Sequence, residues 1–288
     1  MALSLWGIVV HFGHMNWNKD VWIGVGVLAI IGVLIVWFVA THPAPVQAPT
    51  TQPPAGAATS TDQTITDHQP YYDVDAVYPG TTPLAGLPDS ADVNAVALMK
   101  QWETDTIEKF KTESGVTTLT PQDVQMQNLG VDGRKYALGI TYQGSVSART
   151  VSYVFQVYED TLGAHPNAFY HTFTFDTQTG QNLALKDLFV PNAPYLARLS
   201  AAAQADMPAV IAKAENVDLS EVDTSPTGML ATGITPTEDN FANFALDGSD
   251  LVIIFQPYQI GPWALGTQTD RIPLSSLSDI LKPDYQAQ

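Results

Sequence analysis

The sequence predicts an α+β domain with a mainly antiparallel sheet and two or three packing helices, preceded by a single N-terminal transmembrane helix. Three observations lead to this class. Residues 21–40 are an unbroken apolar run, several later segments alternate apolar with polar residues, and amphipathic helical segments lie on either side of those alternating runs. Strands mixed with helices, without a regular strand–helix repeat, are typical of α+β domains.

The apolar run at residues 21–40 predicts a transmembrane signal anchor in contact with the lipid bilayer. Its twenty residues carry no charge, and a helix of that length, at about 1.5 Å per residue, spans the roughly 30 Å core of a bilayer. Trp22 and Trp37 lie near its two ends, where aromatic rings favour the headgroup region. A cleavable signal peptide is the alternative, but its apolar stretch is shorter, about 7–15 residues.

The distribution of basic residues predicts the orientation of this anchor. Lys19 is the only Lys or Arg before the apolar run, and none follows it until Lys100. Under the positive-inside rule, residues 1–20 form a short cytoplasmic tail and the C-terminal domain is extracytoplasmic.

Residues 41–70 predict a linker between the anchor and the folded domain. Residues 41–60 contain five Pro, five Ala, four Thr and no Asp, Glu, Lys or Arg. Such a segment buries too little apolar surface to offset the entropy lost on ordering. Proline favours an extended conformation, so the linker is expected to hold the domain away from the membrane.

Residues 71–288 are expected to form the folded domain, which carries nearly all of the charge. They contain 11 basic and 26 acidic residues, a net charge of −15 out of −17 for the 288-residue chain. This acidity argues against a nucleic-acid partner, which needs a basic surface, and favours a cationic partner. The absence of Cys excludes disulfides, thiolate metal sites and cysteine nucleophiles.

The first half of this domain predicts a helix followed by strands. Residues 88–114 place apolar side chains on one helical face and end at a Ser-Gly pair. Trp102 falls outside this face, and packing against a neighbouring element is its expected role. Alternating runs that begin near Tyr136, Val151 and Phe169 then predict successive antiparallel strands. The predicted core face of the helix comprises Val93, Val96, Ala97, Met99, Ile107 and Phe110.

The second half of the domain predicts one long helix, a loop and further strands. A helix begins near residues 192–194 and should be kinked or split by Pro208. Residues 215–240 are rich in Thr, Asp and Pro and predict a loop. The remaining segments predict a central strand at 251–255, a further strand at 268–272 and a short helix at 274–281.

Four short motifs carry a resemblance to a known family. Residues 163–167 read GAHPN, residues 175–180 FDTQTG, residues 186–189 KDLF and residues 255–266 FQPYQIGPWALG. In this order and spacing they resemble the RsiV-like domain family (domain of unknown function 3298 type), found in lysozyme-sensing anti-sigma factors and beside peptidoglycan deacetylase domains. The resemblance covers residues 71–285, with departures: Leu162 stands where the family commonly has a second glycine, and residues 1–20 are expected to be too short for the sigma-factor-binding segment of the lysozyme-sensing members.

The resemblance implies an extracytoplasmic α+β domain of a bacterium, with peptidoglycan or a lysozyme as its partner. Together with the anchor, it predicts a protein that crosses the bacterial cell membrane once. We expect a membrane-anchored binding or sensing module of the cell envelope that is not an enzyme. Two alternatives stay open: an enzyme acting on cell-wall glycan, and a receptor subunit that signals through a membrane partner.

Four residues are candidates for ligand binding: His165, Asn167, Tyr258 and Trp263. Residues 163–167 also have a structural interpretation, since Gly and Pro favour a turn and His165 can bond backbone groups there. Tyr258 and Trp263 lie in a loop rich in Pro and Gly. They can stiffen that loop, or form a binding surface on which a sugar ring stacks.

No residue of the sequence predicts catalysis or metal binding. The acid pairs Asp73/Asp75 and Glu238/Asp239 resemble Ca²⁺ ligands or the carboxylates that flank a glycosidic bond, but a solvated surface explains them more simply. The sequence contains no nucleophile elbow, phosphate loop or zinc spacing. We therefore expect no catalytic residue, no metal and no cofactor.

Overall fold

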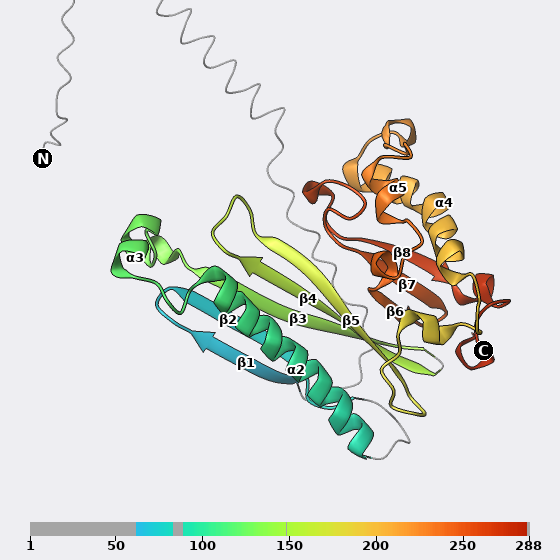
Figure 1. Ribbon diagram of the computed structural model, residues 1–288, viewed down its shortest axis with the longest axis horizontal. Helices are drawn as coiled ribbons and strands as arrows, with labels where there is room; N and C mark the ends of the chain where they lie inside the picture. The colour runs from blue at the N-terminus through green and yellow to red at the C-terminus, as the bar shows by residue number, and fades with distance from the viewer. Residues whose placement is uncertain (1–61, 83–88, 148, 287–288) are drawn as a thin grey trace, which may run out of the picture. The chain divides into compact units, whose positions relative to one another are not determined.

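The computed structural model describes residues 62–82, 89–147 and 149–286, which belong to one compact unit (Figure 1). The predicted tail and membrane span, residues 1–40, lie outside the described residues. Within the described ranges, no helix is both long enough and apolar enough to cross a membrane. These residues form two sheets and four helices, and the predicted α+β class is confirmed.

The first sheet has five strands in the order β1-β2-β3-β4-β5 (Figure 1). Only β2 and β3 are parallel, because two helices, α2 and α3, intervene between them in the chain. The other neighbours are antiparallel. β1 lies within the range predicted as linker. The bounds are β1 Asp62–His68, β2 Tyr72–Pro79, α2 Asp89–Ser114, α3 Pro121–Gln127, β3 Tyr136–Val146, β4 Thr150–Asp160 and β5 Asn167–Asp176.

Helix α2 packs against one face of this sheet. Met99, Ile107 and Phe110 are buried there, as the sequence predicts, together with aromatic and aliphatic residues of the strands. The prediction is wrong for Val93, which is 62% exposed, and for Ala97, which is also exposed. The buried residues of α2 instead recur about every four positions, and they include Glu103. A pattern of apolar residues does not predict that a carboxyl side chain is buried.

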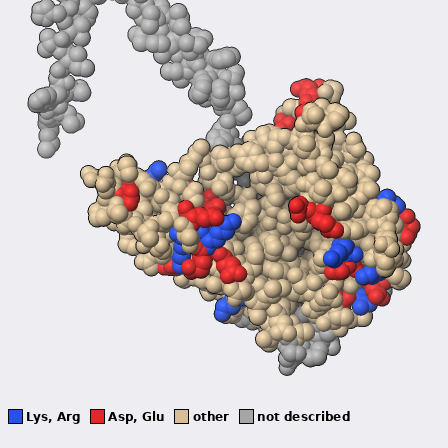
Figure 2. Space-filling view, viewed as in Figure 1, with Lys and Arg blue, Asp and Glu red and all other residues tan. Residues whose placement is uncertain are grey.

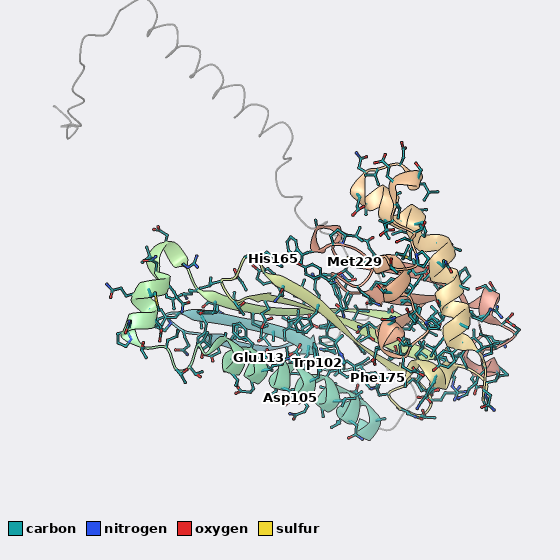
Figure 3. The ribbon with its side chains drawn as sticks, turned by 45° about the horizontal axis from the view of Figure 1, so that its top comes forward. Trp102, Asp105, Glu113, His165, Phe175 and Met229 are labelled. Carbon is teal, nitrogen blue, oxygen red and sulfur yellow. The ribbon has the colours of Figure 1, made fainter. Side chains whose placement is uncertain are left out.

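Trp102 has the packing role that the sequence predicts. Its ring stacks on His171 of β5 with centroids 4.7 Å apart and also contacts Phe155 and Phe173. Figure 3 shows Trp102 on the side of α2 toward the sheet. His171 is therefore a packed histidine, and burial lowers its pKa.

The second sheet has three antiparallel strands in the order β6-β7-β8, with α4 packed on it (Figure 1). The strand predicted at 268–272 is confirmed as β8. Pro208 does not split α4, which continues through it without interruption. The bounds are α4 Tyr195–Glu215, α5 Met229–Gly233, β6 Phe244–Asp247, β7 Asp250–Phe255 and β8 Gln268–Pro273.

Two predictions for the second half differ from the structure. Residues 215–240 are not only loop, because they include α5, whose Leu230 and Gly233 are buried. Residues 274–281 do not form an α-helix. They form a 3-10 turn, Leu274–Leu277, because Leu274 and Leu277 must both reach the core over a short span.

Hydroxyl side chains of the first sheet join it to the outer edge of β6. On the face opposite α2, Ser152 accepts the N–H of Leu246 at 2.9 Å and Thr172 accepts the N–H of Phe244 at 3.1 Å. Ser145 donates to the carbonyl of Leu246. The backbone groups that β6 would otherwise leave unpaired are thereby satisfied.

Candidate functional site

Two loops that are distant in the sequence meet at one end of the first sheet. His165 lies in the turn between β4 and β5, while Tyr258 and Trp263 lie in the loop between β7 and β8. The Nε2 atom of His165 is 3.1 Å from the Tyr258 hydroxyl, and its ring stacks on Trp263 with centroids 4.3 Å apart and an interplanar angle of 28°. Figure 3 shows His165 at this end of the β4–β5 hairpin. We call His165, Tyr258 and Trp263 the aromatic platform.

Asn167, the fourth predicted residue, does not join the platform. It is the exposed first residue of β5 and pairs with Glu159 across the hairpin. Within the described residues, no hydrogen bond joins its side chain to the three aromatic residues. Asn167 and His165 therefore diverge, although only Pro166 lies between them.

The hydrogen bonds of His165 determine which of its two ring nitrogens carries the hydrogen. Nδ1 lies 2.9 Å from the carbonyl oxygen of Pro166, which can only accept, so Nδ1 carries the hydrogen. In the neutral ring Nε2 then accepts from the Tyr258 hydroxyl. Both ring nitrogens are engaged within the protein, and the oxygen lone pairs of Tyr258 remain available to accept from a ligand.

Two glutamines hold the platform loop in place. Gln256 binds the free edge of β5 through both ends of its amide: Oε1 accepts the Tyr170 N–H at 2.8 Å and Nε2 donates to the Tyr170 carbonyl at 2.7 Å. Gln259 donates to the carbonyls of Gly233 and Asn240. The loop is thus fixed both to the first sheet and to α5.

Tyr258 has a left-handed backbone conformation. Its φ is 68°, in the left-handed region that costs a non-glycine residue roughly 1–2 kcal/mol. The N–H of Gln259 closes this turn on the carbonyl of Gln256 at 3.0 Å. Gly233 lets α5 support the turn closely, because a Cβ at that position would lie 2.0 Å from the Gln259 carbonyl oxygen. A strained, well-held aromatic residue is typical of a functional position.

The platform is exposed and uncharged. Tyr258 is 54% exposed and Trp263 39%. Neither residues 161–166 nor residues 256–267 contain Asp, Glu, Lys or Arg, although the chain has a net charge of −17. On the face that Figure 2 shows, charged side chains likewise gather in a few groups with broad uncharged surface between them. A neutral ligand suits the platform better than a charged one.

The acid pairs do not form a metal centre. Asp73 accepts from Lys135 at 3.0 Å, Asp75 from His68 at 2.8 Å, and Glu238 from the hydroxyl of Tyr195. Across residues 62–82, 89–147 and 149–286, no three His, Asp or Glu side chains are grouped as a metal ion would need.

Sequence reasoning found the platform residues but not their supports. Gln256 and Gln259 belong to the FQPYQIGPW motif, and their position within a named motif is the signal that could have found them. Their partners on β5 and α5 are fixed only by the tertiary structure.

Residues 186–275 match the profile of a family described as a protein of unknown function, DUF3298. The chain carries a DUF3298 domain. The matched segment contains Tyr258 and Trp263 but not His165, so the platform of this chain is completed by a residue from the preceding hairpin. The resemblance predicted from the motifs is thereby confirmed.

A curated relative has a named enzymatic activity. The chain is 32% identical over 137 residues to the peptidoglycan-N-acetylmuramic acid deacetylase PdaC of Bacillus subtilis (strain 168). The match covers 48% of this chain but only 27% of that enzyme, so this chain spans about a quarter of the enzyme's length.

One solved structure shows a similar fold, and a second was found at a lower score. A DUF3298 family member from Bacteroides fragilis has a TM-score of 0.53 at 17% identity, with 78% of this chain and 94% of that chain covered. A DUF3298 family protein from Pseudomonas aeruginosa has a TM-score of 0.48 at 14% identity, covering 80% of this chain and 98% of that chain.

Proposed function

We propose that this chain is a membrane-anchored, extracytoplasmic, non-catalytic module of the bacterial cell envelope that binds cell-wall glycan through the aromatic platform. The observation that carries this proposal is the meeting of His165, Tyr258 and Trp263 from two loops on an exposed, uncharged surface. The relation to an enzyme named for its action on peptidoglycan supports glycan as the ligand class.

The chemistry of the platform fits a sugar ring. A pyranose has an apolar face of C–H groups and a rim of hydroxyls, so it packs on an aromatic face while its rim forms hydrogen bonds. Trp263 offers the aromatic surface, and Tyr258 offers an oxygen that accepts from a sugar hydroxyl. The rigid loop lowers the entropy lost on binding.

A binding role suits this site better than a catalytic one. A general base needs an available ring nitrogen or carboxylate within hydrogen-bond reach of the substrate. Both nitrogens of His165 are occupied by Pro166 and Tyr258. The two platform loops, residues 161–166 and 256–267, contribute no carboxylate.

Co-sedimentation of the full-length chain with purified insoluble peptidoglycan tests this function. The wild-type chain should sediment with the glycan, and Trp263→Ala should weaken binding about tenfold or more, which corresponds to about 1.4 kcal/mol. Met126→Ala is a matched control, since it removes an exposed apolar side chain on α3. Wild-type chain that stays in the supernatant, or sediments as well after Trp263→Ala, contradicts the proposal.

A cationic protein such as a lysozyme is a second candidate partner. The observation that favours it is the net charge of −15 on residues 71–288, which attracts a basic protein and speeds encounter. This interaction should weaken strongly between low and physiological salt, whereas glycan stacking should not. Absence of binding to a basic lysozyme at low salt removes this candidate.

A further inference from the structure

One part of the first sheet faces solvent on the side opposite α2. Strand β6 covers the end of this side through Ser145, Ser152 and Thr172. Side chains alternate along a strand, so further residues of β3, β4 and β5 share that side but lie beyond β6. They are Thr141, Gln143, Gln156, Tyr158 and Tyr170, which we call the open face.

The open face is continuous with the aromatic platform. Tyr158 pairs with Ala168. The following pair, Glu159 with Asn167, is the last before the turn that carries His165. Tyr170, on the adjacent strand edge, is bound through its backbone by Gln256 of the platform loop. One rigid connection therefore links the platform to the open face.

The five residues of the open face bear hydrogen-bonding groups and no charge, and carboxylates border them: Asp160 follows Tyr158 on the same side of β4, and Asp73 and Asp75 lie on that side of β2. Thr141, Gln143 and Gln156 are exposed, and Tyr158 is 45% exposed. Hydroxyl and amide groups both donate and accept, as the hydroxyls and acetamido groups of a glycan require. The uncharged Thr, Gln and Tyr side chains match a neutral ligand, while the carboxylates at the border disfavour an anionic one.

A glycine makes room beside the exposed tyrosine. Gly139 pairs directly with Tyr158, and a Cβ placed at Gly139 would lie 3.9 Å from the Cβ of Tyr158. The missing side chain leaves one flank of the tyrosine ring without a neighbour on β3. The ring can instead lie over the glycine to stabilise the sheet, a role that would affect stability and not binding.

We propose that the open face is a second binding surface for the same ligand, and that a linear, uncharged glycan chain runs from the platform across β5, β4 and β3. The proposal rests on the proposed function, because it extends the platform site and names its ligand as a chain and not a single sugar. Three strands span about 10 Å, so the surface is wider than one sugar ring. Tyr158 stacks on a sugar beyond the platform, and Gln156 and Thr141 bind its polar rim.

Calorimetric titration of the full-length chain in detergent with N-acetylglucosamine oligomers tests this extension. The hexamer should bind the wild-type chain about tenfold more tightly than the dimer, because only the hexamer reaches the open face. Tyr158→Ala and Gln156→Ala should each remove most of that advantage and leave dimer affinity unchanged. Trp263→Ala should weaken both oligomers.

Three controls separate binding from folding. Tyr158→Phe keeps the ring over Gly139 and should retain hexamer affinity. Gln156→Ala changes an exposed side chain, so the open face can still be tested with this variant if Tyr158→Ala does not fold. Gln101→Ala, exposed on α2, should change neither affinity.

The outcomes distinguish this inference from the function on which it rests. Equal dimer and hexamer affinities in the wild type, or unchanged hexamer affinity in Gln156→Ala and in a folded Tyr158→Ala, overturn the open-face inference and leave the platform intact. Failure of the wild type to bind either oligomer overturns both.

Discussion

Glu103 is fully buried in α2, and within the described residues neither of its carboxylate oxygens has a hydrogen-bond partner. Burial raises its pKa to about 8, so the side chain is protonated in the folded protein at neutral pH. In the unfolded chain it releases its proton near a pKa of about 4.3. The folded state therefore holds more protons than the unfolded state between these values, and stability falls as the pH rises from about 5 to about 8.

Replacing this carboxyl by its neutral amide should remove that pH dependence. We expect Glu103→Gln to raise the free energy of unfolding at pH 8 by about 1–2 kcal/mol and to change it little at pH 5. Urea denaturation at both pH values measures the effect. Glu108→Gln, on the exposed side of the same helix, is the control. If the free energy of unfolding changes with pH equally in the wild type and in Glu103→Gln, Glu103 is not a buried protonated acid.

Asp176 is buried and fully engaged, in contrast to Glu103. Burial alone would raise its pKa, but hydrogen bonds from Tyr285, the backbone N–H groups of Gln178 and Thr179, and Arg149 outweigh burial and lower it. Its stabilising contribution is therefore present above the ordinary Asp pKa and is lost as the pH falls through the lowered value.

Removing Asp176 should destabilise the domain strongly, because Arg149 and several donors lose their acceptor. We expect Asp176→Ala to lower the free energy of unfolding by about 3–5 kcal/mol. Asp284 contacts the same arginine from a side chain that is 58% exposed, so Asp284→Ala should cost less than about 1 kcal/mol. Thermal unfolding of the two variants gives the comparison, and equal losses would contradict the assigned role of Asp176.

Among the elements, those with a strong hydrophobic period could be predicted and the others could not. The alternation around Tyr136, Val151 and Phe169 locates β3, β4 and β5. Strand β2 was missed because Asp73 and Asp75 suggest a surface segment. Its core side chains alternate with these acids, which bond Lys135 and His68 on the other face.

Helix α4 carries a proline that the surrounding packing tolerates. Pro208 cannot donate to the carbonyl four residues earlier, yet Met207 and Ile211 beside it are buried in the core and hold the helix in place. We expect Pro208→Ala to raise the free energy of unfolding by about 1–3 kcal/mol.

A second proline gives the matched control for this change. Pro121 is the first residue of α3, where proline fits and Thr120 caps the helix, so Pro121→Ala should change stability by less than about 0.5 kcal/mol. Denaturant titration of both variants tests the pair. A destabilised Pro208→Ala would mean that the helix is shaped around its proline.

Gln256 should stabilise the platform loop through its two bonds to β5. Gln256→Ala removes both bonds to the backbone of Tyr170, and we expect a cost of about 1–2 kcal/mol. The amide hydrogen of Tyr170 then loses its acceptor and should exchange with solvent faster. Gln122→Ala, exposed on α3, is the control. Unchanged exchange at Tyr170 would contradict the clamp.

At the scale of the whole molecule, two cores support one surface site. One core lies between α2 and the five-stranded sheet, and the other surrounds α4 and the three-stranded sheet. The platform takes His165 from the first half and Tyr258 and Trp263 from the second.

The sequence indicates the platform residues because they lie in two short motifs rich in Gly and Pro, but it cannot show that the two loops meet. That contact depends on the β6 edge and on Gln256, which are tertiary features. For the same reason, Asn167 looked equivalent to His165 in the sequence, although the first pair of β5 directs it elsewhere.

Hydrogen–deuterium exchange of the full-length chain, with and without soluble peptidoglycan fragments, tests the central claim most directly. Glycan binding at the platform predicts slower exchange in residues 161–170 and 256–266, with α2 and α4 unchanged. Trp263→Ala should abolish that protection while the exchange of both cores stays as in the wild type. Protection confined to other segments, or protection that persists after Trp263→Ala, would contradict the account.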